Sequence, residues 1–343
     1  MSGAALAPDR TRSLLQATVA LGMGLLVLAG FLVLAGFPVM PAVDALWRGA
    51  FGSWYAFSSA ALVHATPLII LGLAFTLGSK AGAINVGMEG QFAAGAIAAT
   101  WVGLHLGALP AMVAIPIVLA AGLLGGAVWI TAPVILRIKF GITEVISTLL
   151  LNFVGYAAVS YAVTGPLQES GRTYPQSDAI AASARLPQLS HGSRLHLGFV
   201  LALVTAALLS VLLRRTTWGF RLRAVGAGPR AAALTGRVSL TKVAGAALLW
   251  SGALAGLGGA VEVSGVSYAL FQNLSPGYGF TAIAVALLGR ERPMLVLVAG
   301  MLFGALEAGA GAMQRDAGIP AVAVQVVEAV VIITALLTAR RSA

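Results

Sequence analysis

Residues 14–37 read LLQATVALGMGLLVLAGFLVLAGF, a predominantly apolar stretch of 24 residues that follows Arg10 and Arg12. The hydrocarbon core of a bilayer needs about 20 apolar residues of helix, whereas the apolar core of a cleavable signal peptide has only about 7–15. The stretch therefore predicts a retained first transmembrane span that enters the membrane from the cytoplasm.

The composition of the whole chain agrees with this interpretation. Of 343 residues, 59% are hydrophobic and only 9% are charged, whereas soluble domains carry about 25% charged residues. The chain cannot coat a water-facing surface of this size, which excludes a single soluble domain. Forty-two glycines indicate closely packed helices in lipid. Because there is no cysteine, disulfides, thiol catalysis and cysteine-based metal sites are excluded.

Nine further apolar stretches have nearly the length of a membrane span. Together with the first they predict an all-α polytopic membrane protein of about ten transmembrane helices, forming a single transmembrane domain over 1–343. We expect the helix near 83–105 to be broken, and the short eighth span, which opens in a Gly/Pro-rich stretch, to be broken or re-entrant. The stretches are 57–78, 83–105, 108–130, 143–164, 196–213, 243–263, 276–289, 293–313 and 320–338.

The net charge of +10 is explained by this topology. With the N-terminus inside, 16 of the 21 basic residues fall on the cytoplasmic side and 21 − 16 = 5 fall outside. This is the bias of the positive-inside rule. An even number of spans also leaves the C-terminus in the cytoplasm. The charge excess therefore gives no support to nucleic-acid binding.

Two hydrophilic segments interrupt the spans. The outer loop 165–194 is either a solvated connector or a docking surface on the outer face. The cytoplasmic segment 214–242 holds seven basic residues and no acid. Within it, Gly228 can be an N-cap, Pro229 can take the first helical position and Gly236 can follow the last turn, which predicts a short helix. Because two turns of helix are not stable alone in water, this helix must dock on its own bundle or on a partner.

An internal echo suggests two related halves. Asn85 and Phe92 match Asn273 and Phe280 at an offset of 188 residues, and alanines follow both pairs. Five predicted spans separate the copies, and an odd number inverts the second copy relative to the first. Inverted repeats with Gly/Pro-interrupted helices indicate the binding site of a transporter. The chain is therefore predicted to hold two inverted five-helix halves, with core segments at 57–164 and 243–338.

Polar residues within the predicted spans are the candidate substrate path, because ionisable groups there are costly and usually functional. In the first half, Asn85, Glu89 and Gln91 are interleaved with glycines that permit unwinding, and Asn152 lies in a later span. The alternative is inter-helix hydrogen bonding that only fixes the bundle. The second-half residues suit a flat polar solute such as a nucleobase or sugar, or else form an interfacial aromatic belt; they are Phe271, Gln272, Asn273 and Tyr278.

The chain has none of the familiar catalytic motifs. None of its three lysines follows a glycine, so a P-loop for ATP is absent. HExxH, a GxSxG elbow and an acidic calcium loop are also absent, and the four histidines are scattered. We therefore expect no catalytic site and no metal site in this chain.

Three stretches resemble the permease subunits of nucleoside and simple-sugar ABC importers, within the ribose and branched-chain amino acid permease superfamily. They are AGAINVGMEGQF (81–92), FGITEVISTLLLNFVGYAAVSYAVTGPLQE (140–169) and GFRLRAVGAGPRAAALTG (219–236). The chain looks most like the larger of two paired permeases. The resemblance implies a second homologous permease, a separate ATP-binding cassette ATPase that holds ATP and Mg²⁺, and a substrate-binding lipoprotein or periplasmic protein. It also implies location in the cell (inner) membrane.

The resemblance further implies a coupling helix that inserts into the ATPase. It maps onto Gly226, Pro229, Arg230, Ala231, Ala232 and Gly236. Family members usually carry an acid or asparagine near the start of this helix, where this chain has Gly226-Ala227-Gly228-Pro229. Transport of branched-chain amino acids or ribose remains an alternative. A second alternative is an ion-coupled secondary transporter that uses Glu89 and Glu328.

Overall fold

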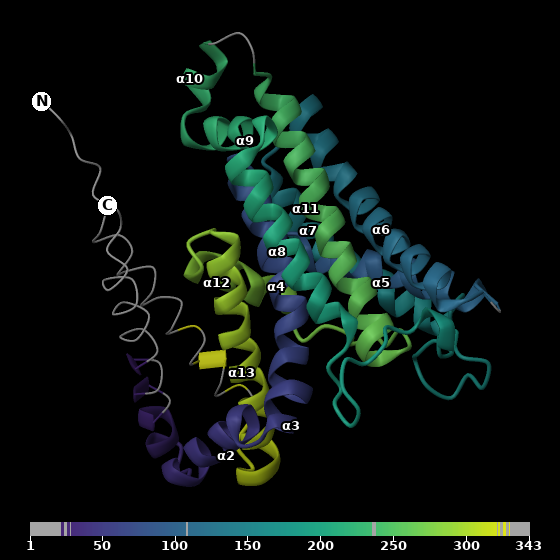
Figure 1. Cartoon of the computed structure of the whole chain (residues 1–343), viewed down its shortest axis with the longest axis vertical. Coiled ribbons are helices and arrows are strands. Elements are labelled where there is room, and N and C mark those ends of the chain that lie inside the picture. Colours follow the sequence, from purple (N-terminus) through teal and green to yellow (C-terminus); the bar gives the residue numbers. More distant parts are fainter. Residues whose placement is uncertain are drawn as a thin grey trace, which may run out of the picture. The chain divides into compact units, whose positions relative to one another are not determined.

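A computed structural model gives the fold of the chain (Figure 1). It describes residues 22–23, 26–27, 29–107, 109–234, 238–320, 322, 325–326 and 329. Across these residues the structure is helical, without a β-strand. The chain divides into two compact units, one formed by residues 62–304 and the other by residues 1–61 with 305–343.

The helices follow the apolar stretches of the sequence. They are α2 (Val39–Phe51), α3 (Trp54–Ala56), α4 (Leu62–Ser79), α5 (Met88–His105), α6 (Ala111–Phe140), α7 (Glu144–Thr164), α8 (Leu197–Arg215), α9 (Thr217–Ala227), α10 (Pro229–Leu234), α11 (Leu240–Glu262), α12 (Tyr278–Leu288) and α13 (Pro293–Ala317). Short π-helical turns precede α4 and follow α11.

Six helical stretches in the described part of the chain are long and apolar enough to cross a membrane. They correspond to six of the predicted spans, those at 57–78, 108–130, 143–164, 196–213, 243–263 and 293–313. In the stretch predicted at 83–105, residues 81–87 are not helical and α5 starts at Met88. The stretch at 276–289 contains the 11-residue α12, which at about 1.5 Å per residue is too short to span a bilayer. Most of 14–37 and of 320–338 lies outside the described residues.

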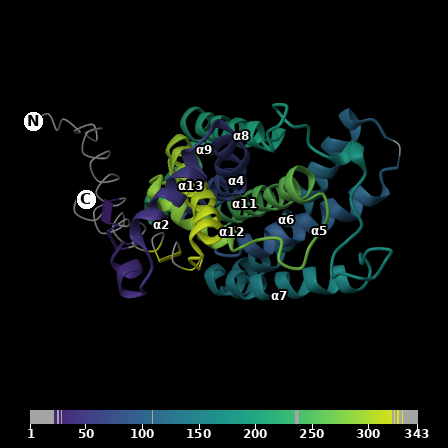
Figure 2. The ribbon, with the colours of Figure 1, turned by 90° about the horizontal axis from the view of Figure 1, so that it is seen from below.

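Helix α11 is the centre of the 62–304 unit, where it packs against α4, α5 and α6 (Figure 2). It approaches α6 closely because glycines face each other at the crossing. A Cβ atom on Gly256 would clash with the carbonyl oxygen of Gly122 and come within 2.7 Å of the Gly126 nitrogen. Such small-residue contacts are how helices associate in lipid, where apolar burial gives no net driving force between them.

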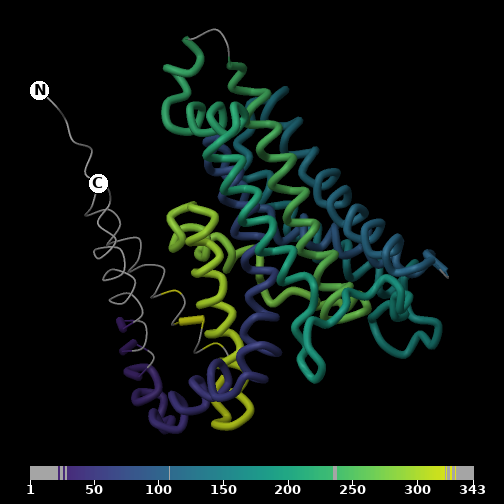
Figure 3. Tube along the Cα trace, in the orientation of Figure 1, coloured from purple at the N-terminus to yellow at the C-terminus, as the bar shows by residue number. Residues whose placement is uncertain are grey.

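Two hydrophilic segments lie at opposite ends of this unit (Figure 3). The loop between α7 and α8 forms one end and has little regular structure besides a single 3₁₀ turn at Ala182–Ala184. Helices α9 and α10 form the other end, and α10 begins at Pro229 as the sequence predicts. The bundle therefore separates the acid-containing loop from the arginine-rich segment.

The other unit contains α2, α3 and the second part of α13. Gly49 of α2 packs against Ala312 of α13, and Gly309 of α13 packs against the backbone of Leu46. These small residues allow the two helices to lie in direct backbone contact.

Candidate functional site

The candidate site begins with an unwound segment between α4 and α5. Residues 81–87 form turns and extended backbone, with Gly82 in the left-handed region at φ +67°. Unwinding removes the helical hydrogen bonds of these residues. Inside a membrane protein the freed backbone groups must find partners in neighbouring helices or in a water-filled cavity.

Helix α7 supplies those partners from one face. Glu144, Thr148 and Asn152 are spaced four residues apart, so they share that face. The N–H of Ile84 donates to Glu144 Oε1 (3.3 Å), and the N–H of Val86 donates to Thr148 Oγ1 (3.3 Å). The third residue bonds twice: Asn152 Nδ2 donates to the Val86 carbonyl oxygen (2.9 Å), and Asn152 Oδ1 accepts from the N–H of Gly90 (2.8 Å).

Buried amides hold the same segment from the other side. Asn85 and Gln91 pair through two hydrogen bonds, of 2.8 Å and 2.9 Å. Asn85 Nδ2 also donates to Ser251 Oγ on α11 (2.9 Å), and Asn85 Oδ1 accepts from the N–H of Gly87 (3.0 Å). Both side chains are almost completely buried. Because these polar atoms are already paired within the protein, Asn85 and Gln91 fix the segment rather than face a solute.

Glu89 lies where the first turns of α5 and α12 meet. Its Oε2 atom accepts a hydrogen bond from the N–H of Gly279 at 2.6 Å, and the side chain is 1% exposed. The N-terminal ends of helices carry partial positive charge, which favours a carboxylate between them. The second oxygen, Oε1, has no hydrogen-bond partner among the described residues. Glu89 therefore keeps a buried acceptor that an incoming donor could use.

A small cavity of about 40 Å³ borders Glu89. This volume admits about one to three water molecules. Two of the lining side chains, Glu89 and Tyr156, come from α5 and α7, and others come from the irregular segment before α12. The full lining is Glu89, Phe92, Ala93, Tyr156, Val159, Gln272, Asn273, Leu274 and Ser275. The two halves of the chain therefore meet at one polar cavity.

The cavity contains only some of the predicted path residues. Glu89, Gln272 and Asn273 line it, and Gln272 also donates to Ser160 Oγ at 3.1 Å. Phe271 does not line it; this residue forms an isolated bridge with Gln176 and is 37% exposed. Tyr278 also lies beside the cavity rather than in its lining.

The Tyr278 ring packs edge-on against Phe92, with centroids 6.1 Å apart, and its hydroxyl lies 3.3 Å from His64 Nδ1. Sequence reasoning missed Tyr156 and Ser275 as lining residues. Tyr156 could have been found, because it continues the four-residue spacing of Thr148 and Asn152 along α7.

The loop between α7 and α8 is tied to the cavity-lining segment. Besides the bridge at Phe271, the N–H of Ser177 donates to the Leu270 carbonyl oxygen (2.9 Å). The loop itself is folded around a carboxylate: Glu169 accepts from the side chain of Gln176 (2.6 Å) and from the N–H of Tyr174 (2.8 Å). The Gln176 bond is the main cause that lowers the pKa of Glu169 below its ordinary value.

The opposite end of the unit connects to the unwound segment as well. A Cβ atom on Gly226, near the end of α9, would clash with the Lys80 carbonyl oxygen and lie 3.2 Å from the Gly82 nitrogen. Lys80 pairs with Glu291 at 2.7 Å, and Ser79 donates to the same carboxylate. Thus α9 is in backbone contact with the residues that lead into the site.

Four of the six predicted coupling residues are solvent-facing in this structure, and a fifth is not: Gly226, Pro229, Arg230 and Ala231 are exposed, and Ala232 is 7% exposed. Gly236 lies outside the described residues. Among the described residues, no group of three His, Asp or Glu side chains could hold a metal ion.

Comparison with known proteins identifies relatives along most of the chain. A family model described as the permease component of branched-chain amino acid transport systems matches residues 57–336. The glucose ABC transporter permease protein TsgB13 of Haloferax volcanii is 37% identical, covering 79% of this chain and 74% of its own length.

Bacillus subtilis has two of these relatives. Its guanosine ABC transporter permease protein NupP is 35% identical, covering 94% of this chain and 93% of its own length. Its guanosine ABC transporter permease protein NupQ is 28% identical, covering 71% and 78%.

Substituting Asn152 tests the role of α7 in holding the unwound segment. The Asn152→Ala change leaves the Gly90 N–H and the Val86 carbonyl buried without their partner, at about 1–3 kcal/mol for each group. We expect a clearly lower thermal unfolding midpoint for the purified chain in detergent. The matched control is Asn273→Ala, because Asn273 is exposed. Equal midpoints for the two variants would contradict this role.

Proposed function

The chain belongs to the family of branched-chain amino acid transport system permease components, a family of multi-pass membrane proteins, and from that premise we propose that it is the membrane-spanning subunit of an ABC importer for nucleosides. Related simple sugars form the neighbouring substrate class, since a glucose permease is among its relatives. A branched-chain amino acid or a ribose-type solute is the alternative within the same family.

The observation that carries the proposal is the polar cavity at Glu89. A nucleoside offers N–H and O–H donors and a flat ring, and the cavity offers a free carboxylate oxygen, two amides and the rings of Phe92 and Tyr156. Sites for small ligands usually measure about 300–1,000 Å³, far more than the cavity of about 40 Å³. We therefore assign this conformation to a closed path that opens during transport.

Ten spans with both termini in the cytoplasm are the topology that we propose. The six apolar helices, the shorter α5 and α12, and the sequence stretches 14–37 and 320–338 together make ten. The orientation is supported by basic residues near the α9–α10 end, including Lys80, Arg137 and Arg221. An interrupted segment precedes both α5 and α12, as expected for two inverted five-helix halves.

In this proposal the chemistry of ATP belongs to other chains. A cassette ATPase with bound ATP and Mg²⁺ docks on α10 and the neighbouring coupling residues, and a second homologous permease completes the pathway. A lipoprotein or periplasmic protein delivers the solute to the α7–α8 loop, which places the importer in the cell (inner) membrane. The pair of guanosine permeases in Bacillus subtilis supports a paired assembly.

Alternating access then follows from contacts already described. ATP-driven movement of α9 and α10 pushes on residues 80–82 through Gly226. These residues lead directly into the unwound segment, so the movement reaches Glu89. At the other end, a protein bound to the α7–α8 loop acts through Ser177 on the backbone beside Gln272.

Uptake by the reconstituted importer tests the proposed function. Proteoliposomes holding this chain, its partner permease and the ATPase should accumulate labelled guanosine when ATP and the binding protein are supplied. Unlabelled nucleosides should compete, while leucine and ribose should not, and a proton uncoupler should have no effect. Uptake that follows a proton gradient without ATP would show instead an ion-coupled transporter. Competition by leucine alone would show an amino acid permease.

The contact of Gly226 with residues 80–82 gives a second prediction. In Gly226→Ala the added methyl group meets backbone atoms of Lys80 and Gly82, which forces α9 away from the segment. We expect ATP hydrolysis to continue while guanosine uptake falls at least about tenfold, a change that corresponds to about 1.4 kcal/mol.

The matched control for Gly226→Ala is Gly228→Ala. A Cβ atom there lies 3.7 Å from its nearest neighbour, Ala231 Cβ, which is ordinary contact. This variant should retain coupled uptake. If both variants transport normally, α9 does not transmit movement through Gly226.

A further inference from the structure

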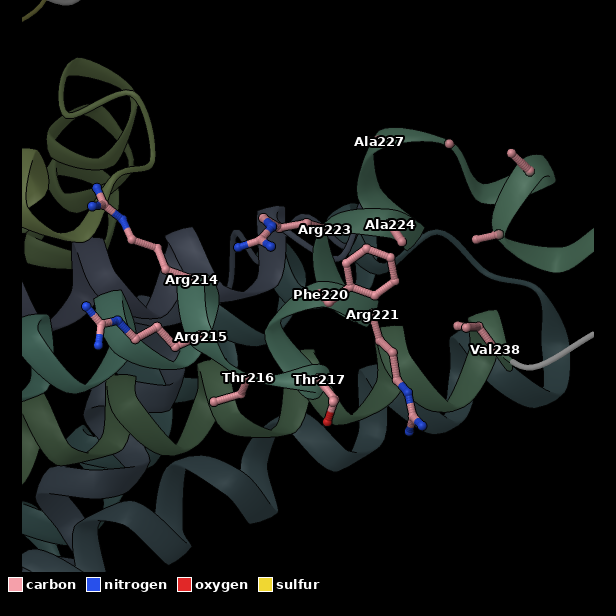
Figure 4. Close-up of a pocket in the computed structure, with 13 residues that line it drawn as sticks. Arg214, Arg215, Thr216, Thr217, Phe220, Arg221, Arg223, Ala224, Ala227 and Val238 are labelled. Carbon is pink, nitrogen blue, oxygen red and sulfur yellow. The ribbon is translucent and has the colours of Figure 1, made fainter. Parts of the chain in front are cut away.

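A large open pocket lies at the α9–α10 end of the bundle (Figure 4). Its volume is about 940 Å³, and it is formed by the end of α8, by α9 and α10, and by Val238 before α11. Four of its lining residues are arginines: Arg214, Arg215, Arg221 and Arg223. We call it the arginine pocket. It lies apart from the cavity at Glu89, with which it shares no lining residue.

The arginines carry charge that the described protein does not neutralise. The ion pairs among described residues involve Arg48, Lys80 and Arg137, and no acidic side chain lines the pocket. The whole segment 214–242 also lacks an acid. Guanidinium groups are well suited to bind phosphate oxygens with paired hydrogen bonds. The charge balance of the pocket therefore indicates an anionic ligand.

The position of the pocket indicates where that anion comes from. Arg214 and Arg215 lie in the last turn of the membrane-spanning α8, which is the depth of the lipid headgroups. Helix α9 lies across the end of α8, and Phe220 projects between Arg221 and Arg223 in Figure 4 with 63% of its surface exposed. Aromatic rings and basic residues at this depth are typical of contact with the membrane interface.

The lining is not charged throughout. Beside the arginines it presents the ring of Phe220 and the methyl groups of Ala224 and Ala231. A lipid matches this combination, because its phosphate and its acyl-glycerol part are joined. A free anion would leave the apolar wall without a partner. We propose that the arginine pocket binds the headgroup of an anionic phospholipid from the cytoplasmic leaflet.

Lipid-dependent thermal stability of the purified full-length chain tests this proposal. A ligand that binds only the folded state raises the unfolding midpoint. Added phosphatidylglycerol should raise the midpoint of the detergent-solubilised protein, and phosphatidylcholine should not. In the double variant Arg221→Gln/Arg223→Gln the apparent affinity for phosphatidylglycerol should fall about 10- to 30-fold, since each basic residue contributes about a factor of 5.

The control is the double variant Arg230→Gln/Lys242→Gln. It removes two charges from the same segment, but neither residue lines the pocket. This variant should keep the response to phosphatidylglycerol. Equal loss in both double variants would overturn the proposal, because it would show a general charge effect.

Two further arms separate other sources of the anion. Glycerophosphate that reproduces the full midpoint shift would identify a free-phosphate site. If phosphatidylglycerol has no effect but the purified ATPase subunit stabilises the chain in a way that requires Arg221 and Arg223, the pocket is a protein interface. Either result would overturn the lipid assignment.

Discussion

The hydrogen bonds between α7 and the backbone of residues 84–90 are the constraint on which the site depends. An unwound segment inside a bilayer is costly unless each freed N–H and carbonyl has a partner. Glu144, Thr148 and Asn152 provide these partners at four-residue intervals along one helical face. With the segment fixed, α5 begins at Met88 and directs Glu89 toward the first turn of α12. Without those bonds, neither the position of Glu89 nor the cavity beside it would be defined.

The same segment joins the two ends of the bundle. On one side Gly226 of α9 is in contact with the backbone of Lys80 and Gly82. On the other side the α7–α8 loop pairs with Leu270 and Phe271, immediately before the residues that line the cavity. A permease must couple events on its two faces without an open channel between them. Close packing at glycines, as between α6 and α11, lets such displacements pass between rigid helices.

Much of this arrangement was predictable from local sequence. The apolar stretches predicted six spans, glycines around Asn85 and Glu89 indicated unwinding, and Pro229 marked the start of α10. Partner choice was not predictable, because it depends on residues far apart in the chain. Asn152 was interpreted as a path residue, yet both ends of its amide bind the backbone near α5. Phe271 was grouped with Asn273, but its bridge to Gln176 turns it away from the cavity lining.

Thiol labelling at position 93 tests most directly whether the closed cavity at Glu89 is the transport path. Ala93 lines the cavity and is 6% exposed, and the native chain has no cysteine, so Ala93→Cys introduces its only thiol. In importers with cysteine-free partner subunits, a polar methanethiosulfonate reagent should label this thiol slowly at rest and faster during ATP turnover. Saturating guanosine should slow the labelling again. A rate that is the same at rest, during turnover and with guanosine would contradict the account.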